Sequence, residues 1–283
     1  MKALYDVPAP AKLNLFLHIT GRRPDGYHLL QSVFMLIDWC DTLHFEVRAD
    51  GLITRDDLDI ALPADDLTVR AARALQASTA CPLGVHISVH KRIPSEAGLG
   101  GGSSDAATTL IALNQLWNLR LSRRQLRDLA PELGADVAFF LGTGSAWVEG
   151  TGELVTPLTG SACPPEQQFV VVKPAGGCAT PAIFSRLQAK DYFGSATISG
   201  FAANHFGYGR NDLQGTAQTL CPELTQALNW LKALGLQGRM SGSGSAVFAA
   251  MPLNFELSEA PQAWEVKICS NLARHPLAGW SPE

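Results

Sequence analysis

The stretch that decides the fold is Pro94-Ser95-Glu96-Ala97-Gly98-Leu99-Gly100-Gly101-Gly102-Ser103-Ser104-Asp105-Ala106-Ala107. Its four glycines within five residues let the backbone turn sharply and approach a ligand closely. A helix follows, because Ala106, Leu110, Leu113 and Trp117 recur at helical spacing. A helix N-terminus has about half a positive charge and free N–H groups, which favour anions. The stretch therefore predicts a loop that binds phosphate at the start of a helix.

Two familiar nucleotide-binding loops differ from this stretch. The pattern G-x-x-x-x-G-K-[ST] needs a lysine after its last glycine, where this chain has Ser103. The dinucleotide pattern G-x-G-x-x-G fits only in part, because Ser103 takes its sixth position and the expected acidic residue downstream is missing. A glycine-rich turn that only caps the helix remains the alternative, and the run of three glycines makes it the less favoured one.

The rest of the chain mixes strands and helices without the regular β-α-β order of a doubly wound sheet. Alternating apolar residues predict strands at residues 13–19, 29–37, 43–47, 85–89, 169–173 and 246–251. Helices are predicted at residues 66–78, after the glycine-rich loop, after the S-x-x-Q capping box of Ser122 and Gln125, from Pro181, and at residues 223–234. We therefore expect an α+β chain with two domains, residues 1–157 and residues 158–283, divided near the proline-rich stretch 156–168.

Two charged residues stand in apolar or small-residue surroundings. Lys12 begins a strand, and Asp136 follows Gly134 with no charged neighbour in sequence. A buried carboxylate needs a cationic partner, so a Lys12–Asp136 pair would satisfy both groups and would suit phosphoryl transfer. Taken separately, Lys12 would be read as a lysine that reaches solvent, and Asp136 as a helix cap. The Gly/Ser segment 238–245 reads by itself as a hairpin turn.

Composition excludes several classes of protein. The 283 residues are 46% hydrophobic and 17% charged, which is ordinary for a globular protein. The net charge of −4 gives no basic surface for nucleic acid, and no apolar run of about 18 residues predicts a membrane span. The six cysteines are widely spaced, and the N-terminus has no signal-peptide pattern. We expect a cytoplasmic protein, as a monomer or homodimer, with small-molecule partners.

The motifs together resemble the GHMP kinases, a superfamily of small-molecule kinases. The resemblance rests on P-A-K-L-N-L at residues 10–15, the loop at 98–107, and the Gly/Ser turn at 241–248. It is supported by segments 133–137, 149–153 and 180–184, so it covers nearly the whole chain. The D-G-Y-H segment at 25–28 is the most specific part, because the sugar and mevalonate kinases lack it.

The resemblance implies the two-domain GHMP kinase fold, with an N-terminal α+β domain related to a ribosomal-protein fold and a ferredoxin-like C-terminal domain. It makes Lys12 and Asp136 the catalytic pair and residues 94–104 the loop around the ATP triphosphate. Further ATP-binding residues would be Asp66, Leu67 and Lys91 at the adenine. The implied substrate-binding residues are Asn14, Tyr27, His28, Thr180, Pro181 and Phe184, with Tyr27 and Phe184 stacking on a cytosine and His28 bonding to it.

The implied activity is ATP-dependent phosphorylation of an alcohol that carries a cytidine diphosphate group. Asp66, Glu96 and Ala138 depart from the usual family pattern, and we expect the Glu96 side chain to point outward. Mg²⁺ would arrive with ATP and have few protein ligands. The alternatives are a related kinase for another alcohol, a dinucleotide-dependent oxidoreductase and a ligand sensor without catalysis. The kinase for another alcohol is disfavoured by Tyr27, His28 and Phe184, and the oxidoreductase is disfavoured by the pattern of the loop. The ligand sensor is disfavoured by the Lys12–Asp136 pair.

Overall fold

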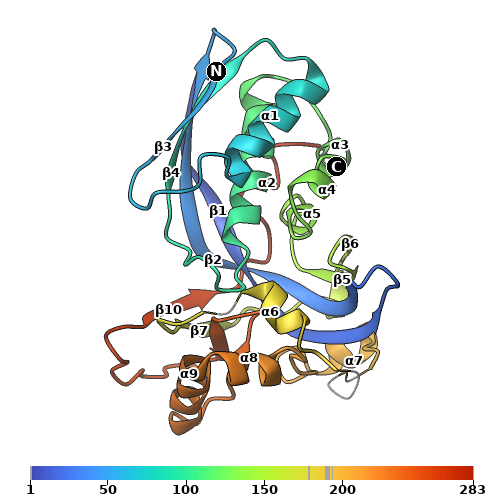
Figure 1. Ribbon diagram of the computed structural model, residues 1–283, viewed down its shortest axis with the longest axis vertical. Coiled ribbons are helices and arrows are strands. Elements are labelled where there is room, and N and C mark those ends of the chain that lie inside the picture. Colours follow the sequence, from blue (N-terminus) through green and yellow to red (C-terminus); the bar gives the residue numbers. More distant parts are fainter. Residues whose placement is uncertain (1, 178, 189–191, 193, 283) are drawn as a thin grey trace.

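The structure is a computed structural model that describes residues 2–177, 179–188, 192 and 194–282 (Figure 1). It consists of two antiparallel-rich sheets packed with helices, which confirms the α+β prediction. The larger sheet contains β1 (Ala3–Arg22), β2 (His28–Arg48), β3 (Ile53–Asp57), β4 (Gly84–His90), β5 (Ala146–Gly150) and β6 (Leu154–Pro157). Its order is β3-β4-β2-β5-β6, and β1 pairs with β2 along most of its length.

Strand β2 corrects the prediction of two short strands at residues 29–37 and 43–47. The polar residues between them continue the strand because tertiary partners satisfy their side chains. Asp41 is fully buried and accepts the backbone N–H groups of Arg92 and Ile93, and Asp38 accepts the N–H of Ser270. Strand β3 was also missed, and it lies parallel to β4. The long strand β1 carries the catalytic candidate Lys12 and the substrate-binding candidate Asn14, and β2 begins at His28, another substrate-binding candidate.

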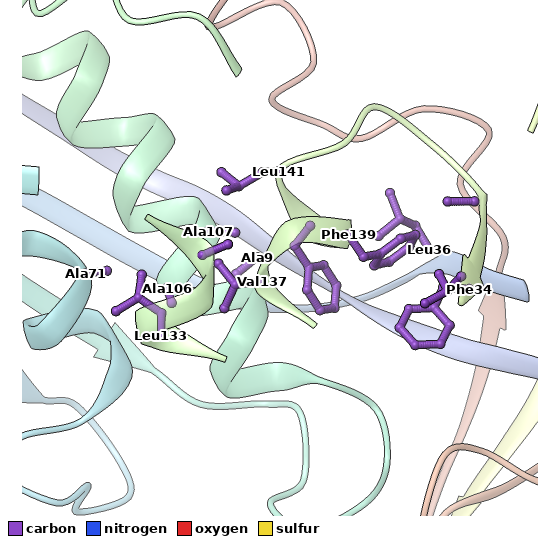
Figure 2. Close-up of a cluster of buried hydrophobic side chains, with 14 of the residues drawn as sticks. Ala9, Phe34, Leu36, Ala71, Ala106, Ala107, Leu133, Val137, Phe139 and Leu141 are labelled. Carbon is purple, nitrogen blue, oxygen red and sulfur yellow. The ribbon is translucent and has the colours of Figure 1, made fainter. Parts of the chain in front are cut away.

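The helices of the N-terminal part cover one face of the larger sheet (Figure 1). They are α1 (Leu67–Thr79), α2 (Gly101–Leu116), α3 (Arg123–Arg127), α4 (Ala130–Leu133) and α5 (Val137–Phe140). The capping box of Ser122 and Gln125 is present, as predicted. Figure 2 shows that α2 presents the small side chains of Ala106 and Ala107 toward its neighbours, so that the elements pack closely. This close packing fixes the start of α2 relative to the sheet.

The smaller sheet has the order β10-β7-β9-β8. Its strands are β7 (Gln168–Lys173), β8 (Arg239–Met240), β9 (Val247–Ala250) and β10 (Glu265–Ser270). The helical elements of this part are η1 (Gly160–Ala162), α6 (Thr180–Phe184), α7 (Ile198–Ala203), α8 (Gln214–Leu220) and α9 (Pro222–Ala233). The short turn between β8 and β9 reaches toward the glycine-rich loop, and this contact positions the site.

The last residues of the chain return to the N-terminal helices, where the C-terminus lies beside α3 (Figure 1). The backbone N–H of His275 donates to Thr143 O at 2.8 Å, and that of Arg123 donates to Pro282 O at 2.7 Å. The C-terminal tail therefore ties the two parts together. Among the described residues, none of the helices combines the length and apolarity needed to cross a bilayer.

Candidate active site

A cleft of about 760 Å³ lies where β1, the glycine-rich loop, α5, α6 and the β8–β9 turn meet. Its walls include most of the residues singled out in the sequence: Lys12, Asn14, Asp66, Leu67, Lys91, residues 94–103, Asp136, Thr180, Pro181 and Phe184. Tyr27, His28 and Ser104 do not line it. Segments more than 100 residues apart in the chain thus form one cavity.

The glycine-rich loop depends on two glycines with positive φ, Gly98 at 73° and Gly100 at 74°. Gly98 passes so close to the β8–β9 turn that an added Cβ would lie 2.1 Å from Ser241 O. Main-chain bonds join the same two segments, since Ser245 N donates to Glu96 O at 3.1 Å and Ala246 N donates to Ala97 O at 3.0 Å. Glu96 itself is exposed and also lines the cleft, so the expected outward direction of its side chain stays a prediction.

Helix α2 begins directly after this loop, with Gly100 as its N-cap and no side chain capping it. The first N–H groups of a helix have no intrahelical acceptor, so those of α2 are available to a ligand. Together with the helix dipole, free N–H groups of this kind favour an anion. The loop and the helix start have the predicted geometry, and phosphate binding stays a prediction.

Lys12 and Asp136 meet in the cleft, with 3.5 Å between Lys12 Nζ and Asp136 Oδ2. The Lys12 ammonium lies 4.6 Å from the centre of the Phe34 ring, and Lys12 as a whole is only 3% exposed. Burial lowers the pKa of Lys12, and the nearby charge of Asp136 opposes that shift. Asp136 occupies the N-cap position of α5, yet its side chain makes no capping hydrogen bond. Capping therefore does not explain Asp136, whereas pairing with Lys12 does.

Asn14 connects this pair to the loop. Lys12 Nζ donates to Asn14 Oδ1, and Asn14 Nδ2 donates to Ser32 Oγ at 3.0 Å. Ser241 Oγ accepts the backbone N–H of Asn14 at 3.2 Å and donates to Gly98 O at 3.0 Å. The sequence predicts Ser241 only as part of a turn, because its place in this network depends on tertiary contacts. The network fixes the position of the ammonium relative to the loop.

At the other end of the cleft, two of the expected adenine residues have their polar groups engaged by the protein. Asp66 caps α1 by accepting Val69 N at 3.2 Å, and it forms an ion pair with Arg55. Lys91 Nζ is paired with two buried carboxylates, and Leu67 contributes an apolar wall. The charged groups of Asp66 and Lys91 therefore hold neighbouring protein segments in place at this end of the cleft. Leu67 offers an apolar surface for a flat ring.

The expected substrate residues divide into a buried and an exposed group. The rings of His28 and Phe184 lie 5.4 Å apart at 35°, and burial lowers the pKa of His28, assisted by the charge of Arg22. Tyr27 is 66% exposed and does not line the cleft. Thr180 Oγ1 lies 2.6 Å from Ser243 Oγ, which joins α6 to the β8–β9 turn.

Comparison with known proteins identifies the family. The profile "GHMP kinases N terminal domain" matches residues 66–144, and "GHMP kinases C terminal" matches residues 181–265. A 4-diphosphocytidyl-2-C-methyl-D-erythritol kinase of Acidovorax sp. (strain JS42) is 66% identical over 280 residues, 99% of each chain. The chain belongs to the GHMP kinase family. A protein of Delftia acidovorans (strain DSM 14801 / SPH-1) with the same enzyme name is 62% identical over 99% of this chain and 98% of its own.

Solved GHMP kinase structures share this fold. A crystal structure of a 4-(cytidine 5'-diphospho)-2C-methyl-D-erythritol kinase has a TM-score of 0.77 and 33% identity, covering 93% of this chain and 98% of that one. Homoserine kinase from Cytophaga hutchinsonii has a TM-score of 0.68 at 14% identity, covering 97% and 96%, and this likeness concerns the fold alone. GHMP kinases use ATP as cosubstrate. The two-domain GHMP kinase fold predicted from the motifs is confirmed.

Proposed function

We propose that this chain is an ATP-dependent kinase that phosphorylates the 2-hydroxyl of 4-diphosphocytidyl-2-C-methyl-D-erythritol, a step of non-mevalonate isoprenoid precursor synthesis. Relatives with that enzyme name are 59–66% identical over nearly the whole chain. The observation that carries the proposal is the contact between Lys12 and Asp136 inside the cleft that the glycine-rich loop also lines. A carboxylate, an ammonium and an anion site in one cavity are the parts that phosphoryl transfer needs.

The transfer step follows from these parts. The oxygen of the substrate hydroxyl attacks the γ-phosphorus of ATP, the bond between that phosphorus and the bridging oxygen breaks, and ADP leaves. Asp136 orients the hydroxyl and accepts its proton. Lys12 offsets the negative charge that develops on the attacking oxygen, and the N–H groups of residues 94–104 hold the phosphates in line.

The cytidine end of the substrate is assigned to Asn14, Tyr27, His28, Thr180, Pro181 and Phe184. The buried His28 Nε2 has no hydrogen-bond partner within the part of the chain that the structure describes, which suits a group that bonds to a base. Phe184 offers a ring at the cleft wall, while Tyr27 is exposed and would have to turn toward the cleft to stack on the opposite face of a bound cytosine. Stacking of this kind contributes about 1–3 kcal/mol per base.

The nucleotide is assigned to residues 94–104 with Asp66, Leu67 and Lys91. Mg²⁺ enters with ATP as part of the cosubstrate, because this ion keeps several waters and binds readily to phosphate oxygens. Within the described residues, no three His, Cys, Asp or Glu side chains gather as a metal site.

Replacing Asp136 by Asn tests the assignment. We expect kcat to fall about 10²–10⁴-fold, the usual contribution of a positioned acid–base group, while the affinity for ATP stays near that of the wild type. The exposed Asp128→Asn substitution makes the same charge change at the end of α3 and serves as the control. Full turnover in Asp136→Asn on 4-diphosphocytidyl-2-C-methyl-D-erythritol would refute the role of this carboxylate.

A further inference from the structure

A second cluster of buried charges lies beneath the glycine-rich loop, where α2 meets β2 and the end of β4 (Figure 1). Lys91 Nζ donates to Asp105 Oδ2 at 2.6 Å and also to Asp41 Oδ2. The side chains of Lys91, Asp105 and Asp41 are 7%, 3% and 0% exposed. One ammonium thus faces two carboxyl groups away from water, so the cluster has one negative charge too many if both are ionised.

The two carboxyl groups are not equivalent. Asp41 Oδ1 accepts the backbone N–H groups of Arg92 at 2.5 Å and Ile93 at 2.7 Å, in addition to the bond of its other oxygen with Lys91. Asp105 Oδ1 is buried and has no hydrogen-bond partner among the described residues. The protein therefore compensates negative charge on Asp41 and leaves Asp105 as the group that retains a proton more readily.

The cluster adjoins the surface that would receive the nucleotide's phosphates. Asp105 and Lys91 both line the cleft. An added Cβ on Gly101, the first residue of α2, would lie 3.3 Å from Lys91 Nζ. Because the cluster is this close to the anion site, its net charge acts directly on a bound polyphosphate.

Three charged pairs lie on the surrounding elements: Lys12 with Asp136 from β1 and α5, Arg55 with Asp66 from β3 and α1, and His90 with Asp59 beside the end of β4. Asp38 of β2, Arg70 of α1 and Arg92 after β4 are exposed. Glu96 of the loop is exposed. The groups that act on Asp105 are therefore Lys91 and Asp41. Burial raises the pKa of Asp105 to about 8, Lys91 opposes the shift, and Asp41 adds to it.

We propose that Asp105 is a positioning residue of the nucleotide site whose proton keeps the Asp41–Lys91–Asp105 cluster neutral, so that the loop above it binds a polyphosphate. This inference rests on the proposed function only in taking ATP as the ligand of the loop. When the proton is lost, the cluster gains one negative charge next to the phosphates, and nucleotide affinity falls.

The test compares equilibrium binding of ATP to the wild type and to Asp105→Asn between pH 6.5 and pH 9.5. Asparagine keeps an acceptor for Lys91 and cannot ionise. The ratio of the two dissociation constants removes the titration of ATP itself. We expect the ATP affinity of the wild type, relative to that of Asp105→Asn, to fall about tenfold as pH rises through about 8. The reason is that one added negative charge this close to the phosphates weakens binding by about a factor of ten. The control Asp128→Asn should follow the wild type at every pH.

A ratio that stays constant over this range would overturn the inference. Carbon-13 NMR of the Asp105 carboxyl group in the wild type gives an independent measurement if the variant fails to fold. It should titrate near pH 8 without nucleotide and about one unit higher with ATP, as linkage with a tenfold affinity change requires. Titration below pH 6 would contradict the proposal. Turnover of 4-diphosphocytidyl-2-C-methyl-D-erythritol at pH 7 tests the proposed function separately, because it does not depend on which pKa Asp105 has.

Discussion

Replacing Gly98 by Ala should separate the glycine-rich loop from the β8–β9 turn. The new Cβ would lie 2.1 Å from Ser241 O and 2.9 Å from Gly244 N, both backbone atoms that cannot move alone. The φ of 73° adds about 1–2 kcal/mol for a residue other than glycine. Moving the turn also weakens the hydrogen bond from Ser241 Oγ to Gly98 O, and bonds of this kind contribute about 1 kcal/mol each.

These contributions sum to about 3 kcal/mol of lost stability, because at least one neighbouring main-chain bond between loop and turn weakens as well. For a chain of this size we expect Tm to fall by about 6–12 °C, measured by thermal unfolding followed by circular dichroism. The position of Lys12 depends on the same turn through Asn14 and Ser241, so kcat should also fall in Gly98→Ala.

Gly102→Ala is the matched control. Its Cβ would lie 3.5 Å from Leu67 Cδ1, an ordinary contact, and alanine favours the helix by about 1 kcal/mol relative to glycine. Its Tm should equal or exceed that of the wild type. A Tm for Gly98→Ala within 1–2 °C of the wild type, about what a few tenths of a kcal/mol produces, would refute the reasoning about close backbone approach.

Two further predictions concern the substrate and the acid stability of the fold. The double change Tyr27→Ala, Phe184→Ala should raise KM for the cytidylyl substrate about tenfold or more, since a stacked base contributes about 1–3 kcal/mol, and should leave KM for ATP nearly unchanged. If steady-state kinetics showed equal changes in both KM values, the stacking assignment would be contradicted. Burial, assisted by the charge of Arg123, lowers the pKa of His275 from 6.5 to about 3, so below pH 6.5 the unfolded chain binds a proton that the folded chain does not. The free energy of unfolding should fall by up to about 1.4 kcal/mol per pH unit between pH 6.5 and about 3. The variant His275→Asn, whose amide oxygen can still accept the N–H of Leu277, should reduce that slope when stability is measured by urea unfolding. An unchanged slope would exclude His275 as its source.

Local sequence was sufficient to predict those features of the fold that depend on the geometry of a short segment. The glycine-rich loop and the helix after it could be predicted because a positive φ at Gly98 and a free helix N-terminus are properties of short segments. The capping box at Ser122 is local for the same reason. These features depend on neighbours within a few residues, so a single sequence contains all the information needed.

Prediction from the sequence failed where the conformation or environment of a residue depends on partners far away in the chain. Asp38 and Asp41 resemble a strand break, yet they lie inside β2 because Ser270, Arg92 and Ile93 satisfy their oxygens. The same dependence hid the role of Asp105, which belongs to the loop motif but obtains its unusual environment from β2 and the end of β4. No spacing within one segment could indicate these contacts.

In the mechanism that we propose, the unequal exposure of Lys12 and Asp136 gives the two groups different tasks. The Asp136 side chain is 29% exposed and Lys12 only 4%, so a hydroxyl that enters the cleft reaches the carboxylate first. Lys12 lies behind it, held by Asn14 and the ring of Phe34, and acts through its charge. Because burial lowers the pKa of Lys12 while Asp136 opposes the shift, protonation of the carboxylate during transfer removes part of the support for the ammonium. In the same proposed mechanism, return of that proton to solvent restores the pair, so the exposed part of Asp136 would both contact the substrate and release the proton.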